Sequence, residues 1–163
     1  MSASSSKKTT PFYLVRTLGL YQPFATLMLH GKVETRWVRK GKKAPFPLGR
    51  YLIYSTKKYY KPSQELATLC GYVNYNRLMQ IVQGKDETWP NGRAICIGDL
   101  VKIIDPICPP FNQNTFVNNE WETQTHRRVG LVFENVKRVK PYEFTGKQGV
   151  GFYKGPSGLI EPI

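Results

Sequence analysis

Three charged side chains at alternate positions are the first residues in this chain whose types and spacing suggest chemistry. Lys32, Glu34 and Arg36 are separated by Val33 and Thr35. Because alternate side chains of an extended strand share a face, we expect the three charged groups to lie together and Val33 and Thr35 to face the other way. Such a cluster can bind an anion through its cations and accept a hydrogen bond through its carboxylate.

Aromatic and amide side chains lie close to this cluster in the sequence. Trp37 follows it directly, and Tyr21 and Gln22 precede it. Bases stack on aromatic planes, phosphates bind lysine and arginine, and a carboxylate or an amide can pair with the polar edge of a base. These residue types suit recognition of nucleic acid. A structural interpretation stays open: Glu34 and Arg36 can form an ion pair that holds a strand in place, and Trp37 can belong to the core.

A short helix is predicted to position the cluster. Residues 13–20 have strand composition, and Pro23 fits the first position of a helix, where its missing N–H costs little. The apolar residues that follow recur at helical spacing, and Gly31 is a natural helix end. We therefore expect a mostly buried helix that ends just before Lys32.

The rest of the chain alternates irregularly between strand and helix patterns. The composition predicts an α+β fold around a small mixed β-barrel with about three short helices. Residues 1–10 are expected to form a disordered basic tail, and residues 11–163 a single domain. Strands are predicted at 49–55, 94–104 with a bulge at Gly98, 129–139 and near 150–153, helices at 64–69 and 76–82, and a long surface loop at 108–128.

The charge balance favours a polyanionic partner. Lysine and arginine number 24 against 11 acidic residues, a formal net charge of +13. Long-range attraction and counterion release favour binding to nucleic acid or to an anionic membrane. The predicted first helix has no basic face, no apolar run reaches the roughly 20 residues that span a bilayer, and the N-terminus has no signal-peptide core. We expect a soluble, intracellular and cytoplasmic protein that binds no membrane.

The cysteines and histidines predict neither a disulfide framework nor a metal site. Cys70, Cys96 and Cys108 are odd in number and widely spaced, and His30 and His126 have no neighbour at ligand spacing. Buried free thiols are the expected state, and no cofactor is implied.

The chain resembles the ASCH domain (activating signal cointegrator homology), which belongs to the PUA-like superfamily of small β-barrels. The matching pieces follow the order of the family over most of the chain. They are LGLYQPFATLMLHG at 18–31, VETRW at 33–37, GRYLIYSTKK at 49–58, GKDETWPNG at 84–92, AICIGDL at 94–100 and, more weakly, GKQGVGFYKG at 146–155.

The resemblance implies a cleft, next to the helix after Gln22-Pro23, that recognises one base, modified or not, of RNA or single-stranded nucleic acid. The tyrosines and basic residues near the cluster would supply stacking planes and phosphate contacts. The candidate nucleic-acid-binding residues are Tyr21, Gln22, Lys32, Glu34, Arg36, Trp37, Arg39, Lys40, Arg50, Lys57 and Lys58.

The spacing departs from the family pattern at one place. That pattern is G-x-K-x-x-E-x-R, whereas here Gly31 and Glu34 are two residues closer together. Glu34 and Arg36 match directly, and Lys32 matches if the turn after the helix is tight.

Enzymatic alternatives remain open. Relatives with a similar fold are amidohydrolases of acylated cytidine that use a lysine, a threonine nucleophile and a glutamate, and a nearby lysine can activate a hydroxyl. Here Glu34 occupies the position of that threonine, so a catalytic set would comprise Lys32, Glu34 and the adjacent Thr35. Ribonuclease activity would need Lys32 and Glu34 as an acid/base pair. A protein-interaction module of the kind found in transcription coactivators is a further alternative.

Overall fold

The predicted strands form one mixed sheet. The structure, a computed structural model, describes residues 12–59, 64–83, 92–111, 114–140 and 149–156. The predicted tail at 1–10 lies outside these ranges. The strands are β1 (Phe12–Gln22), β2 (Glu34–Arg39), β3 (Gly49–Tyr59), β4 (Ala94–Ile104), β5 (His126–Arg138) and β6 (Gly149–Pro156).

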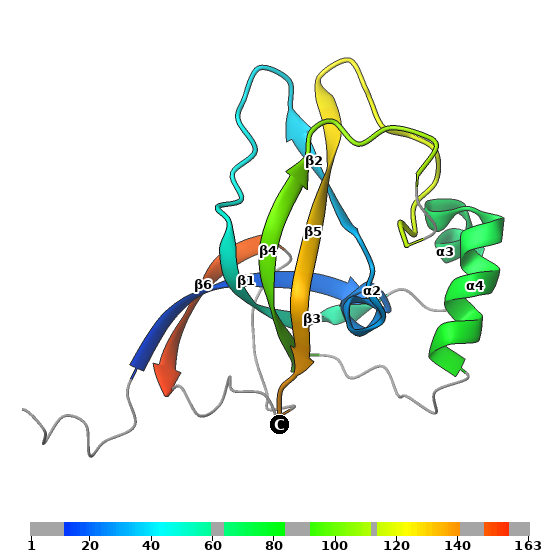
Figure 1. Cartoon of the computed structure of the whole chain (residues 1–163). Coiled ribbons are helices and arrows are strands. Elements are labelled where there is room, and N and C mark those ends of the chain that lie inside the picture. The colour runs from blue at the N-terminus through cyan, green and yellow to red at the C-terminus, as the bar shows by residue number, and fades with distance from the viewer. Residues whose placement is uncertain (1–11, 60–63, 84–91, 112–113, 141–148, 157–163) are drawn as a thin grey trace, which may run out of the picture.

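The sheet has the order β2-β5-β4-β3-β1-β6 and curls into a half-barrel (Figure 1). β1 and β3 are parallel, and the other neighbouring strands are antiparallel. The register of β4 against β5 shifts between Ile97 and Asp99, which confirms the bulge predicted at Gly98. β2 is an edge strand, so one side of its backbone faces no other strand of the sheet. The predicted α+β fold around a small mixed barrel is confirmed.

Three α-helices lie within the described residues: α2 (Phe24–Leu27), which continues as the 3-10 turn η1 (Met28–His30), α3 (Gln64–Cys70) and α4 (Tyr72–Gln83). Pro23 directly precedes α2, and Gly31 follows η1 with a φ of 80°. This left-handed conformation suits glycine and ends the helix where the sequence predicts. α4 begins earlier than the predicted residue 76, because Gly71, at φ 85°, provides the break after α3.

The buried residues form three clusters: two that involve the sheet and a third among the helices. Tyr51 and Ile53 of β3 belong to the main cluster of buried residues, whereas Leu52 belongs to a second cluster. This alternation agrees with the period of a strand. A third cluster joins Leu27 of α2 to Leu66 of α3, Leu78 of α4 and Phe116. In Figure 1, α3 and α4 lie to one side of the sheet, with α2 between them and the strands.

The connection between β4 and β5 corrects a prediction. Residues 108–128 were expected to form a surface loop, but β5 already begins at His126, and Phe116 is only 1% exposed. The connection reaches across to α3 and α4 (Figure 1), where Asn118 N–H donates to the carbonyl of Leu69. It is therefore part of the helical core.

Two of the three free thiols are buried. Burial raises the pKa of Cys70 to about 11 and that of Cys96 to about 12. Cys108 is exposed, so the expectation of buried thiols is wrong for this residue, which directly precedes the exposed pair Pro109-Pro110. Among the described residues, none of the helices combines the length and apolar character needed to span a bilayer.

Candidate functional site

A cavity of about 320 Å³ lies along β2. Its wall combines residues from β1, α2, β2, α3, the β4–β5 connection and β5. The lining residues are Leu20, Tyr21, Phe24, Lys32, Glu34, Thr35, Arg36, Trp37, Leu69, Val117 and Arg128. Consecutive residues of β2 point to opposite faces, yet both sets line the cavity, because β2 is an edge strand.

The predicted charged cluster lies in this wall. Lys32 Nζ donates to Glu34 Oε1, and Arg36 Nη1 lies 3.6 Å from Glu34 Oε2. The side chains of Lys32 and Glu34 are 3% and 6% exposed, and that of Arg36 is 20% exposed. The alternating positions therefore do bring the three groups together, and the ion pair between Glu34 and Arg36 is present within a larger network.

A tight turn after η1 brings Lys32 to Glu34. The N–H of Lys32 donates to the carbonyl of Leu27, and Gly31 supplies the left-handed conformation. The next N–H, that of Val33, donates to Asn114 in the β4–β5 connection. The helix end thus leads directly into β2, which accounts for the short spacing between Gly31 and Glu34.

Burial sets the protonation chemistry of Lys32. Removal of its ammonium group from water lowers the pKa of Lys32, Arg36 lowers it further, and the carboxylate of Glu34 opposes both effects. The ammonium also lies 4.6 Å from the centre of the Phe24 ring, a cation–π contact. Glu34 is therefore the main group that keeps a positive charge favourable at this buried position.

Arg128 of β5 completes the wall. Its guanidinium donates from Nε to the carbonyl of Glu120 and from Nη1 to Thr35 Oγ1, and its Cζ lies 4.3 Å from the centre of the Trp37 ring. Arg128 and Trp37 are register partners in β5 and β2. Burial lowers the pKa of Arg128, whereas Glu120 and Glu34 raise it. A guanidinium nevertheless stays protonated at neutral pH.

The charges in the wall do not balance. Lys32, Arg36 and Arg128 carry positive charge, and Glu34 is the one acidic residue among those that line the cavity. With all four groups ionised, an excess of two positive charges faces the cavity. The indole of Trp37, 41% exposed, lies beside them, so it is not a core residue.

Other candidate residues do not line the cavity. Gln22 is fully buried, and its Oε1 accepts the backbone N–H of Thr26, so it holds the start of α2. Arg50 is exposed and pairs with Asp99, and Lys57 is exposed near the end of β3. The side chain of Lys58 lies outside the described residues.

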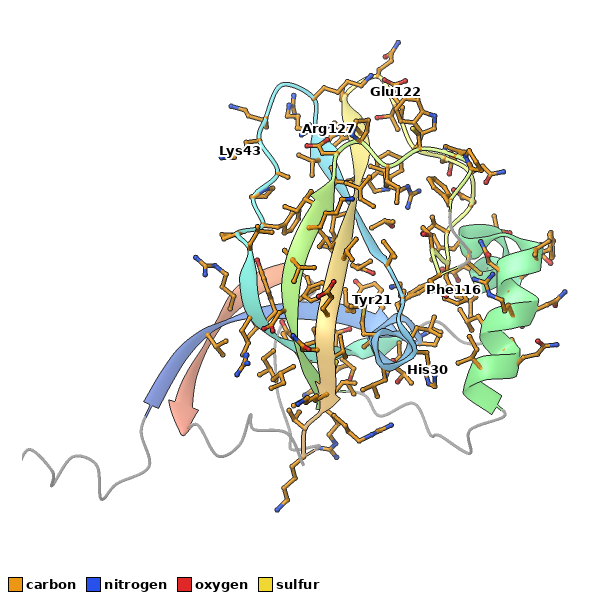
Figure 2. The ribbon with its side chains drawn as sticks, in the orientation of Figure 1. Tyr21, His30, Lys43, Phe116, Glu122 and Arg127 are labelled. Atoms are coloured by element: carbon orange, nitrogen blue, oxygen red, sulfur yellow. The ribbon has the colours of Figure 1, made fainter. Side chains whose placement is uncertain are left out.

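Arg39 and Lys40 belong to a basic arm, residues 39–49, which runs from the last residue of β2 to the first residue of β3. Lys40 pairs with Glu122, and Arg127 donates to the backbone carbonyls of Arg39 and Lys42. Arg127 also binds Asp105 through two nitrogens and thereby lowers the pKa of that carboxyl. Figure 2 shows Lys43, Arg127 and Glu122 at one end of the molecule, well away from Tyr21 beside α2.

Sequence reasoning missed five lining residues. Leu20 and Phe24 were assigned only to a strand and a helix, whereas Leu69, Val117 and Arg128 come from distant segments. Arg128 was the last residue of the predicted loop at 108–128. Its register opposite Trp37, which the sequence does not reveal, is what places it in the cavity wall. Thr35 was expected to face away from the charged cluster; it does contact Arg128 on the other face of β2, yet it still lines the cavity.

Replacement of the buried carboxylate is predicted to destabilise the protein. In Glu34→Gln, Lys32 and Arg36 lose their counter-charge, so the free energy of unfolding should fall by about 3–5 kcal/mol. Urea denaturation measures this change. The double variant Lys32→Met/Glu34→Gln should recover much of the loss. Asp99→Asn, which breaks an exposed pair with Arg50, is the control and should cost at most about 1 kcal/mol. Equal losses in both single variants would contradict the prediction.

Comparisons with known proteins identify the fold. A scan against protein-family models and a search of curated proteins gave no match. A crystal structure of a serine-to-alanine variant of ZmASCH from Zymomonas mobilis is similar, with a TM-score of 0.51 and 13% identity over 85% of this chain and 87% of that chain. A tyrosine-to-phenylalanine variant of ZmASCH gives a TM-score of 0.48 and 11% identity over 85% and 88%. The similarity to the serine-to-alanine variant shows that the chain has an ASCH-like fold.

Proposed function

We propose that this protein binds RNA or single-stranded nucleic acid and that the cavity along β2 takes one base with its phosphate. The observation that carries the proposal is the composition of the wall: an excess of buried and half-buried cations beside an exposed indole. The cavity volume of about 320 Å³ falls within the range of about 300–1,000 Å³ that is usual for ligand sites.

The cations suit a phosphate. Arg36 is 20% exposed, so its guanidinium can contact both Glu34 and a ligand. A bound phosphate would offset the excess positive charge and favour the charged form of Lys32. Guanidinium donors match the oxygens of a phosphate in geometry as well as in charge.

The aromatic groups suit a base. Arg128 stacks on the Trp37 ring and holds it at the edge of the cavity, and Tyr21 lines the same cavity. Glu34 Oε2 is only loosely paired, at 3.6 Å from Arg36, so it retains the capacity to accept a hydrogen bond from the amino group of a base. Stacking would supply affinity, and Glu34 would supply discrimination.

Binding of single-stranded RNA is predicted to weaken with salt. Because each phosphate of a single strand that the protein neutralises contributes about −0.7, the logarithm of the association constant should fall with the logarithm of the salt concentration with a slope of about −0.7 or steeper. Fluorescence anisotropy of a labelled oligonucleotide at several salt concentrations measures the slope. Affinity that does not change with salt, or no binding at low salt, would overturn the proposal.

Removal of the indole is predicted to weaken binding to all bases. Trp37→Ala should lower the affinity for single-stranded RNA about tenfold, because stacking of a base on an aromatic ring contributes about 1–3 kcal/mol and tolerates any base. Trp121→Ala is the matched control, since Trp121 does not line the cavity. Titrations with the four homopolymers compare the variants. A similar loss in both variants would show that Trp37 has no special role in binding.

Hydrolysis of an acylated nucleoside is the second candidate function. Thr35 and Lys32 line the same cavity, and burial lowers the pKa of Lys32, which favours a base that could activate the threonine hydroxyl. Against it, Lys32 is paired with Glu34, and Thr35 Oγ1 accepts a hydrogen bond from Arg128. Binding therefore remains our first proposal.

Incubation with acylated cytidine separates these two functions. On the binding proposal, the release of free cytidine, followed by chromatography, should not differ between the unmodified protein and the variants Lys32→Ala and Thr35→Val. Release that needs both side chains would replace binding by hydrolysis as the principal function.

A further inference from the structure

A second cavity, of about 680 Å³, lies between α4 and the β4–β5 connection. Its wall contains both apolar and polar side chains, and none of the residues that line it is acidic. Val117 lines both this cavity and the one along β2, so the two are neighbours that share one side chain. The lining residues are Val73, Asn74, Arg77, Pro109, Pro110, Phe111, Thr115, Val117 and Asn119.

Arg77 is the charged residue of this wall. Its Cζ lies 4.5 Å from the centre of the Phe116 ring, and Phe116 is itself almost fully buried. The Nη2 atom of Arg77 is buried and has no hydrogen-bond partner among the described residues. Stacking on Phe116 thus holds a guanidinium whose donors are not all used, although an unpaired buried donor costs free energy.

The wall around Arg77 is held by hydrogen bonds. Asn74 Nδ2 donates to the carbonyls of Cys70 and Val117, at 2.9 and 3.0 Å. These contacts tie α4 to the β4–β5 connection, as does the contact of Asn118 N–H with the carbonyl of Leu69. Figure 2 shows Phe116 between this connection and α4. The cavity is therefore built from segments that are fastened to each other.

Apolar side chains are exposed at the rims of the two cavities. Leu69, which lines the first cavity, is 39% exposed, and Val73, which lines the second, is 80% exposed. Such side chains can contact the sugars and base faces of an extended strand. A guanidinium that lines the cavity, set between apolar contacts and without acidic neighbours in the wall, suits a phosphodiester.

We propose that the second cavity is a subsite for the same single strand, in which Arg77 binds the phosphate of a nucleotide next to the one in the first cavity. This inference rests on the proposed function. It extends the ligand from one nucleotide to a segment of at least two, which passes from Trp37 over Val117 to Arg77. Affinity should then rise when the ligand is lengthened beyond one nucleotide.

Ligands of increasing length test this inference. Uridine monophosphate, a dinucleotide and a tetranucleotide are titrated into the unmodified protein and into Arg77→Gln. The variant should bind the tetranucleotide about tenfold more weakly, the effect of losing one charge-assisted hydrogen bond, and should bind the mononucleotide as before. Its salt slope should be smaller by about 0.7 in magnitude, the contribution of one phosphate on a single strand. Arg138→Gln, which removes an arginine at the far end of β5, should change none of these values.

A surface substitution makes the test independent of folding. Val73 is exposed, so Val73→Glu and Val73→Gln should both fold like the unmodified protein, as urea denaturation can verify. Val73→Glu places a negative charge beside the second cavity and should weaken binding of the tetranucleotide but not of the mononucleotide, whereas Val73→Gln should have little effect.

The possible failures are distinguishable. If affinity does not rise beyond one nucleotide, or if Arg77→Gln and Val73→Glu match their controls, the second subsite is wrong while the proposed function stands. If no RNA of any length binds, the proposed function fails and this inference fails with it.

Discussion

The burial of one carboxylate among cations is the interaction on which the site depends. Glu34 is 5% exposed and holds Lys32, which is equally buried, and Arg36, which is less so. Removal of a charge from water is costly, and the lowered pKa of Lys32 is the expression of that cost. Because Glu34 cannot neutralise every cation around it, the wall keeps the positive excess from which we infer an anionic ligand.

The edge position of β2 makes this network accessible. A central strand has a neighbouring strand along both of its edges, whereas β2 pairs with β5 alone among the described residues, so its other edge is open to the cavity. Residues from its two faces therefore reach one cavity: the ionic network on one side, and Trp37 with Arg128 on the other. The same pairing orients Arg128, whose hydrogen bond to Thr35 ties the two strands together by their side chains.

The helices and the β4–β5 connection form the rest of both walls. Phe116 packs with Leu27, Leu66 and Leu78, so one aromatic residue joins three helices to the connection. The same ring makes a cation–π contact with the guanidinium of Arg77. Packing in this small cluster therefore helps to position both the outer wall of the first cavity and the guanidinium of the second, which links the two proposed subsites.

The sequence by itself determined the local part of this arrangement. The helix end at Gly31, the strands and the common face of Lys32, Glu34 and Arg36 follow from glycine conformation and from the alternation along a strand, which act over a few residues. Tertiary structure alone decided that Arg128 meets Trp37, that the β4–β5 connection is partly buried, and that Gln22 holds a helix rather than lining the cavity. Those outcomes depend on strand register and on packing between distant segments, which no local pattern encodes.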